Sequence, residues 1–235
     1  MKLDELTPDF SGMEITVKRT EVVRNSKLQK LSDTYAEHAK LVFIFDVSGS
    51  MDSSISYDCK TGESGPGKMD LVKKLARQEI EKRYQKFPGS RVAVIQFGSR
   101  AETIFDDGAP DELWPALENL TAHGHLSYST DILSGIRKAM EVCRAKPSRI
   151  GVHHFIIVGD GQDSGTYAID SWLPALKASG VVLDYIHIGS EGSLNEPLQK
   201  ACVALAGEFV TVDSEEAFEA KFIAAAERLC LPPGK

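Results

Sequence analysis

The feature that most constrains the fold is an alternation, from residue 41 onwards, of short apolar runs with segments of helical periodicity. Leu41–Phe45 is a continuous apolar run with β-branched and aromatic residues, and Val92–Phe97 is similar. Such runs are typical of strands that are buried on both faces. Between the two runs, apolar residues recur at helical spacing: Val72, Leu75, Ala76, Ile80, Tyr84 and Phe87. Strands that alternate with helices indicate a mainly parallel sheet with helices on both faces.

The same pattern continues to the end of the chain and predicts six strands. They are Leu41–Phe45, Val92–Phe97, Ala101–Phe105, Phe155–Val158, Val181–Ile188 and Phe209–Val212. Further helices are predicted over 132–143, Tyr167–Ser179, Leu194–Ala206 and Ser214–Leu229. We therefore expect one α/β domain over residues 41–235, preceded by a polar extension over residues 1–40.

The extension has weaker patterns. Met13–Val23 alternates loosely and is compatible with an edge strand, while Leu28, Leu31 and Tyr35 share one helical face. Neither segment carries residues that suggest chemistry. We expect an extension that packs on the main domain or trails from it.

Composition excludes several classes of protein. With 235 residues and 42% hydrophobic content, the chain can bury a large core without disulfide bonds. A net charge of −7 with no basic run argues against binding to nucleic acid. No apolar run approaches the roughly 20 residues that a membrane helix needs, so we expect no membrane insertion.

The cysteines and the N-terminus point to a cytoplasmic protein. Cys59, Cys143, Cys202 and Cys230 are widely spaced and form no CxxC pair, so neither a zinc framework nor a disulfide set is indicated. Reduced thiols are the simplest interpretation. The first residues contain no apolar segment of the kind found in signal peptides.

Three polar clusters follow or precede the predicted elements at one end of the sheet. Asp46-Val47-Ser48-Gly49-Ser50 follows the first strand, Ser129-Thr130-Asp131 precedes a central helix, and Gly159-Asp160-Gly161 follows the strand Phe155–Val158. Ligands of open α/β sheets bind beyond the carboxyl ends of the strands. In an extended segment, the alternate side chains of residues 46, 48 and 50 would face the same way, with Asp46 towards solvent and ion. Oxygen ligands of this kind suit a hard cation such as Mg²⁺ or Mn²⁺.

This constellation resembles the metal-ion-dependent adhesion site of von Willebrand factor A domains. The resemblance rests on Asp46-x-Ser48-x-Ser50, then Thr130, then Asp160 in a strand-end Asp-Gly, in the family's order and spacing. Thr130-x-x-x-x-Gly135-Ile136-Arg137-Lys138 also looks like the threonine loop and following helix of integrin inserted domains. The resemblance to von Willebrand factor A domains covers roughly residues 41–229. The form Asp-Val-Ser-Gly-Ser-Met is similar to bacterial and other intracellular members.

The resemblance implies a fold and a function. The fold is a doubly wound, mainly parallel sheet with one short antiparallel edge strand, which Ala101–Phe105 could supply. Ser48, Ser50 and Thr130 would contact Mg²⁺, Mn²⁺ or Ca²⁺ directly, and Asp46 and Asp160 would act mainly through waters. The ion would coordinate an Asp or Glu of a partner protein, which predicts an interaction module and no enzyme.

Two other interpretations compete with this one. Singly, Ser48, Ser50 and Thr130 could be helix caps and Asp160 a turn residue. Alternatively, Asp46 and Asp160 could hold Mg²⁺ in a phosphoryl-transfer or hydrolytic enzyme, although the sequence indicates no nucleophile.

Other motifs are expected to be incidental. Gly62–Lys68 fits GxxxxGK, but Met69 replaces the hydroxyl residue that binds Mg²⁺ in phosphate-binding loops, so Lys68 and Met69 are predicted to serve solvation and packing. His123 and His125 could form an auxiliary metal pair, but are expected to be loop residues, and His153 and His154 packed or edge groups. Residues 52–66 are predicted to form a long loop at the rim of the metal site. Its glycines favour a mobile loop, and the alternative is a loop that selects the partner.

Overall fold

The predicted alternation of strands and helices is present in the computed structural model, which describes residues 33–34, 37–55, 64–122, 124–126, 128–161, 168–189 and 195–228. Its six strands are β1 (Lys40–Asp46), β2 (Arg91–Phe97), β3 (Ala101–Asp106), β4 (His153–Gly159), β5 (Val181–Ile188) and β6 (Phe209–Val212). Each lies where the sequence predicts it, within two residues at either end.

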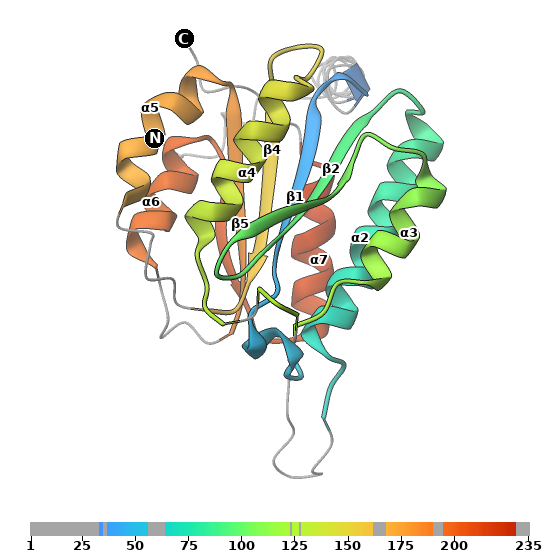
Figure 1. Ribbon diagram of the computed structural model, residues 1–235, viewed down its shortest axis with the longest axis vertical. Helices are drawn as coiled ribbons and strands as arrows, with labels where there is room; N and C mark the ends of the chain where they lie inside the picture. The colour runs from blue at the N-terminus through green and yellow to red at the C-terminus, as the bar shows by residue number, and fades with distance from the viewer. Residues whose placement is uncertain are drawn as a thin grey trace, which may run out of the picture.

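The strands form one sheet in the order β3-β2-β1-β4-β5-β6. All neighbouring pairs are parallel except β2 and β3, which are antiparallel and joined by a short connection at Gly98–Arg100. The predicted antiparallel edge strand is therefore confirmed. The chain winds outwards from β1 in both directions (Figure 1), so β1 and β4 occupy the centre of the sheet.

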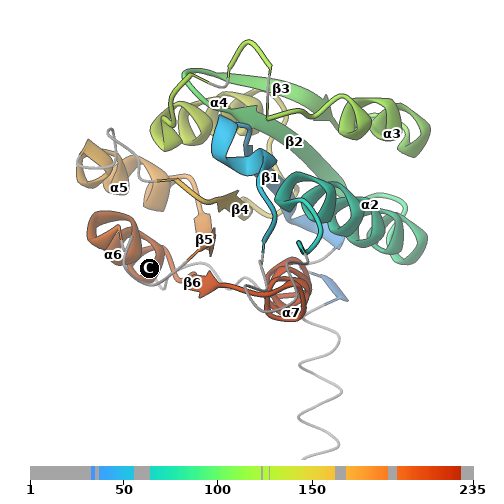
Figure 2. The ribbon, with the colours of Figure 1, turned by 90° about the horizontal axis from the view of Figure 1, so that it is seen from below.

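Helices cover both faces of the sheet, as the sequence predicts. The helices are α2 (Lys68–Lys86), α3 (Pro110–Glu118), α4 (Ile132–Ala145), α5 (Ile169–Ala178), α6 (Glu196–Ala204) and α7 (Glu215–Ala226). One hydrophobic cluster joins α2, α3 and α7 to the sheet, and a second joins α4, α5 and α6 to the opposite face. Figure 2 shows the sheet between these two layers.

Residues of β1 alternate between the two hydrophobic clusters. Leu41, Phe43 and Phe45 pack under α2 and α7, whereas Val42 and Ile44 pack under α4. All five side chains are buried. This arrangement explains why the strand is a continuous apolar run, since neither of its faces meets water.

Helix α4 packs unusually close to the sheet at Gly135. A Cβ atom at this position would lie 2.8 Å from Ile44 Cγ2 and 3.3 Å from the Phe97 ring. Only glycine allows this approach, which fixes the start of α4 and the segment before it relative to β1 and β2.

The division into an extension and a domain stays a prediction. The first strand begins at Lys40, and the possible edge strand Met13–Val23 lies outside the described residues. Within the described ranges, no helix is long and apolar enough to cross a membrane.

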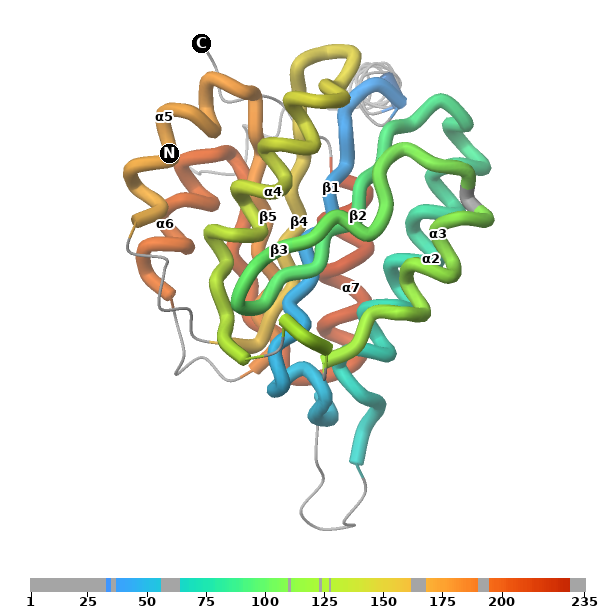
Figure 3. The backbone as a smooth tube through the Cα atoms, in the orientation of Figure 1, coloured from blue at the N-terminus to red at the C-terminus, as the bar shows by residue number. Residues whose placement is uncertain are grey.

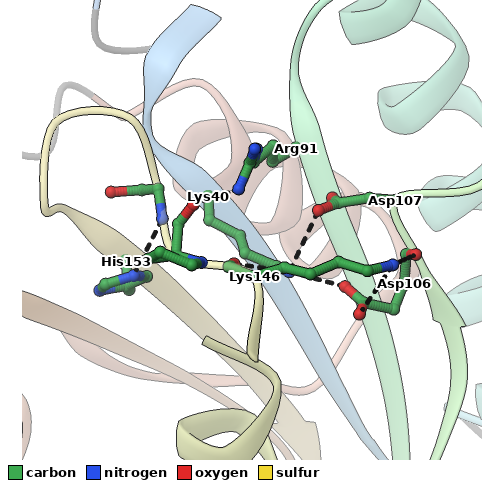
Figure 4. Close-up of polar contacts among 8 residues, drawn as sticks. Lys40, Arg91, Asp106, Asp107, Lys146 and His153 are labelled. Carbon is green, nitrogen blue, oxygen red and sulfur yellow. Dashed lines mark hydrogen bonds and ion pairs between the residues drawn. The ribbon is translucent and has the colours of Figure 1, made fainter. Parts of the chain in front are cut away.

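A buried lysine connects the amino-terminal end of β1 to the end of β3. β3 runs antiparallel to β2, so it ends at the end of the sheet where β1 begins, with β2 between them, and the Lys40 side chain reaches across to Asp106 (Figure 4). The fully buried Lys40 Nζ donates to Asp106 Oδ1 at 2.6 Å, to Asp107 Oδ2 at 3.3 Å and to the Lys146 carbonyl at 3.2 Å. Two carboxylates thus share one enclosed cation, which attaches the edge strand to the sheet centre.

His153, at the start of β4, lies at the same end of the sheet as Lys40. Its buried imidazole is neutral, accepting one hydrogen bond and donating another. Its Nε2 accepts the Ser148 N–H at 3.2 Å, and its Nδ1–H donates to the Ser179 carbonyl at 2.8 Å. Burial lowers the pKa of His153 below its ordinary value of 6.5. Protonation would place an N–H opposite another N–H donor. His153 and His154 are packed groups of a central strand, so the edge alternative is wrong.

We predict that Lys40→Met destabilises the domain by about 3–5 kcal/mol, because it leaves two carboxylates without their enclosed cation. Urea unfolding at pH 7 measures this. Lys146→Met is the matched control: the Lys146 side chain is half-exposed and its Nζ also contacts Asp106, at 3.2 Å, so its loss should cost about 1 kcal/mol or less. Equal effects of the two substitutions would contradict the proposed difference in burial.

We also predict that acid weakens the fold partly through His153. The unfolded chain takes up a proton near pH 6.5, whereas folded His153 does so only at lower pH. The free energy of unfolding should therefore decrease as pH falls from 7.5 through 6.5. His153→Gln should reduce this pH dependence without abolishing it, since the pKa of His187 is lowered by burial as well. Urea unfolding at pH 7.5, 6.5 and 5.5 tests this, and an unchanged pH dependence in the variant would refute it.

Candidate metal site

The predicted ligand residues lie at the carboxyl ends of the central strands. Asp46 is the last residue of β1, and Asp160 directly follows β4, which pairs with β1 in parallel. Thr130 precedes α4 at the same end of the sheet. Figure 3 shows the segments after β1 and before α4 at this end, close to the start of α2.

Asp46 is fully buried, which corrects the expectation that it faces solvent. Its Oδ1 accepts the Ser48 backbone N–H at 2.8 Å. On the other side, the backbone of Gly159 is so close that a Cβ there would lie 3.0 Å from Asp46 Oδ2 and 3.1 Å from the Tyr185 hydroxyl. The end of β1 is therefore enclosed by its own turn and by β4.

Ser48 and Ser50 converge, although not through an extended segment. Residues Gly49–Asp52 form a short 3₁₀ helix (η2), in which the Met51 N–H donates to the Ser48 carbonyl at 3.0 Å. The Met51 side chain is fully buried in the core, which holds this turn against the domain. The two hydroxyl oxygens are 3.1 Å apart. The expected convergence is present, but a turn produces it.

Asp160 connects to this pair through Ser50. The Ser50 hydroxyl donates to Asp160 Oδ1 at 2.6 Å, across 110 residues of sequence. The Asp160 side chain is only 2% exposed. Oxygen atoms from the ends of β1 and β4 therefore form a continuous series.

Thr130 is brought to the site by the loop before α4. A Cβ at Gly161 would lie 3.1 Å from Thr130 Oγ1, which places this hydroxyl beside the backbone that follows Asp160. Asp131, not Thr130, caps α4 by accepting the Ser134 N–H at 3.1 Å. Ser48 likewise makes no side-chain capping bond to η2. The alternative that these hydroxyls are helix caps is therefore not supported at either position.

Lys68 is a member of the site that the sequence did not indicate. It is the first residue of α2, and its Nζ forms an ion pair with Asp160 Oδ2 and lies 3.4 Å from the Ser50 carbonyl. Its side chain is 13% exposed. The expectation of a solvated Lys68 is wrong, because the acidic end of the sheet draws its ammonium group inwards. Met69 packs in the core as expected.

His187, in β5, is a second residue that sequence reasoning missed. Burial lowers its pKa; the charge of Lys68 acts in the same direction, and that of Asp160 opposes them. The imidazole is 2% exposed and stacks on Tyr185, with ring centroids 6.2 Å apart. A buried aromatic layer thus lies beside the acidic groups. In the sequence, His187 is a histidine within an apolar strand, and this pattern does not indicate that it lies beside the site.

The other predicted features are only partly described. His125 contacts Glu102 at 3.0 Å and is an exposed loop residue, while His123 lies outside the described residues, so a histidine metal pair stays a prediction. Of the long loop, residues 56–63 also lie outside, and its two ends meet in a bridge between Ser54 and Gly67.

The arrangement of donors fits a hard divalent cation. The two carboxylates and three hydroxyls offer only oxygen atoms as metal ligands, with no thiol or imidazole among them. Ligands about 2.1 Å from Mg²⁺ at right angles are about 3.0 Å apart. The separation of 3.1 Å between the hydroxyl oxygens of Ser48 and Ser50, two of the expected direct ligands, is similar. Asp46, Ser48, Ser50, Thr130 and Asp160 are thus residues that could hold the ion.

Comparison with known proteins identifies the family. The sequence profile of the von Willebrand factor type A domain matches residues 41–162, just over half of the chain. The chain therefore belongs to the von Willebrand factor type A (VWA) family. No curated protein matches the whole sequence closely enough to be recognised as a relative.

Solved structures share the fold at low sequence identity. The VWA domain of SpRpn10 is similar with a TM-score of 0.62 and 13% identity, over 79% of this chain and 94% of that one. The PilB minor pilin from Streptococcus sanguinis has a TM-score of 0.60 and 14% identity, over 81% of this chain, which spans only 61% of the pilin chain.

A third structure is that of proximal thread matrix protein 1 from the mussel byssus, described with zinc in its metal-ion-dependent adhesion site (MIDAS) motif. Its TM-score is 0.62 and its identity 22%, over 82% of this chain and 46% of that one. At these identities, the three likenesses show a common fold.

We predict that the protein does not bind ATP through its GxxxxGK motif. The Lys68 ammonium group is directed to Asp160, and the position of the Mg²⁺-binding hydroxyl is taken by the buried Met69. A titration with a fluorescent ATP analogue should show no saturable binding. Saturable binding that Lys68→Ala abolishes would overturn this prediction.

Proposed function

We propose that this protein is a metal-dependent interaction module. A divalent cation, Mg²⁺ or alternatively Mn²⁺ or Ca²⁺, would be held by Asp46, Ser48, Ser50, Thr130 and Asp160, and would coordinate an Asp or Glu of a partner protein. The observation that carries the proposal is the series of oxygen atoms that joins Ser48, Ser50 and Asp160 across the ends of β1 and β4.

The chemistry of these groups supports binding to an outside carboxylate. Three of the five side chains are neutral hydroxyls, which leave much of the charge of a bound ion uncompensated. The carboxylates of Asp46 and Asp160 are enclosed, so they supply countercharge and orient the hydroxyls. A cation that is held in this way retains affinity for a further anionic ligand.

The alternative enzyme would use the same carboxylates to hold Mg²⁺ for phosphoryl transfer or hydrolysis. It needs an activated nucleophile or water in addition. The Ser50 hydroxyl, which donates to Asp160, is engaged within the proposed ligand set. A phosphatase assay with Mg²⁺ on the purified protein separates the two functions, and metal-dependent turnover would favour the enzyme.

We propose a reducing compartment, the cytoplasm, as the location. Cys143 and Cys202 are both buried free thiols, in helices on one face of the sheet. Burial raises the pKa of Cys143 to about 12 and also raises that of Cys202. Thiols in this state are unreactive core residues, so the proposal rests on the wide spacing of the four cysteines in the sequence, which indicates no disulfide set.

We predict that Mg²⁺ stabilises the protein and that Thr130→Val removes this effect. With a Kd of about 1 mM, 10 mM Mg²⁺ would stabilise the folded state by about 1.4 kcal/mol. For a chain of this size, the melting temperature would then rise by about 3–6 °C. Thr130→Val keeps the shape of the side chain and removes its hydroxyl, so it should abolish most of the rise.

Ser129→Ala is the matched control, since it removes an exposed hydroxyl from the neighbouring residue. It should keep the full Mg²⁺ effect. Melting of both variants and the wild type, each in EDTA and in Mg²⁺, is compared with capture of partner proteins under the same conditions. If the melting temperature of the wild type does not respond to Mg²⁺ or Mn²⁺, the proposed site is wrong.

A further inference from the structure

Lys68 occupies a position at which a lysine is locally unfavourable. It is the first residue of α2, and the positive end of a helix dipole disfavours a cation there. The N-cap is Gly67, which has no side chain to cap the helix. Apart from Asp70 in the first turn of α2, the groups that stabilise the Lys68 ammonium belong to the acidic end of the sheet.

The ammonium group of Lys68 supplies charge that the proposed metal site lacks. Asp46 is fully buried and the Asp160 side chain is 2% exposed, so two carboxylates are enclosed at one end of the sheet. Burial lowers the pKa of the neighbouring His187. Lys68 forms the ion pair with Asp160 and also reaches the Ser50 carbonyl.

Both oxygens of Asp160 are engaged in this arrangement. Oδ1 accepts from the Ser50 hydroxyl, and Oδ2 pairs with Lys68 Nζ. A divalent cation held by Ser50 and Asp160 would therefore meet the ammonium group at close range. Two like charges in one enclosed site repel strongly, so the two cations compete for the same carboxylate.

The backbone of Lys68 allows this exchange without movement of the helix. Its N–H donates to the Ser53 carbonyl at 3.0 Å, and the Leu71 N–H donates to the Gly67 carbonyl at 3.1 Å. These bonds hold the start of α2 next to η2. The four-carbon side chain can leave Asp160 by rotation about its own bonds.

We propose that Lys68 is a tethered cation that neutralises the acidic end of the sheet in the absence of metal and sets the affinity for divalent cations by competing with them. This inference rests on the proposed metal site. Lys68, which is not one of the proposed ligands, would then determine the concentration of divalent cation at which the site is filled.

The first test compares Mn²⁺ binding by calorimetric titration of metal-free protein. Lys68→Gln removes the charge and keeps a polar side chain, whereas Lys68→Arg keeps the charge. Lys74→Gln is the matched control, because it makes the same change of charge on the exposed side of α2, where Lys74 lies 3.7 Å from Glu215.

We expect Lys68→Gln to bind Mn²⁺ at least roughly fivefold more tightly than the wild type. This is the effect of one unit charge on another at about 4 Å with the screening of bulk water, and the double charge of Mn²⁺ makes it a lower bound. Its melting temperature in EDTA should be lower, because Asp160 loses its cation. Lys68→Arg and Lys74→Gln should resemble the wild type in Mn²⁺ affinity.

The outcomes separate this inference from the proposed function. If the wild type binds Mn²⁺ and Lys68→Gln binds no more tightly, competition by Lys68 is wrong and the metal site stands. If neither binds Mn²⁺, both proposals are wrong. Binding by Lys68→Gln alone would support both.

A second test uses the unaltered protein and so does not depend on the folding of a variant. Lysine amines are labelled with an acylating reagent in EDTA or in Mn²⁺, and mass spectrometry follows each site. Lys68 should be labelled slowly in EDTA and severalfold faster in Mn²⁺, with Lys74 unchanged. An equal or slower rate at Lys68 in Mn²⁺ would overturn the inference.

Discussion

The burial of β1 on both faces is the constraint on which the rest of the structure depends. Phe43 and Ile44 contact opposite hydrophobic clusters, so helices must cover both sides of the sheet. Such cover requires crossover connections, which make neighbouring strands parallel. Because β1 and β4 are parallel, their carboxyl ends meet at one edge of the sheet. Asp46 and Asp160 come together there for that reason.

The two ends of the sheet each contain a lysine–aspartate ion pair, but the two lysines differ in how far they are buried. At the amino-terminal end, Lys40 is fully enclosed and pairs with Asp106 and Asp107. At the carboxyl end, Lys68 reaches Asp160 from the start of a helix and keeps 13% of its side chain exposed. A lysine on a central strand has no room to leave its partners, whereas a lysine on a helix end does. The first pair is structural, and we propose that the second is exchangeable.

The shared fold does not by itself give a binding function. The similar structures have identities of 13–22% with this chain, and the pilin and the byssus protein are longer than it is. The proposed function therefore depends on this chain's own groups. A site with two enclosed carboxylates and three hydroxyls suits a cation that keeps an open position, and the buried apolar sheet beneath it holds these groups in place.

The sequence by itself determined the six strands, their alternation with helices and the candidate residues Asp46, Ser48, Ser50, Thr130 and Asp160. The strands and helices follow from local periodicity. The candidate residues follow from the rule that ligands bind at strand ends, together with the resemblance to the metal-ion-dependent adhesion site. Only the tertiary structure decided the burial of Asp46, the 3₁₀ turn that joins Ser48 to Ser50, and the positions of Lys68 and His187. Lys68 and Asp160 are 92 residues apart and belong to elements with no shared pattern. Their contact depends on how α2 packs against the sheet, and local spacing along the chain carries no information about that packing.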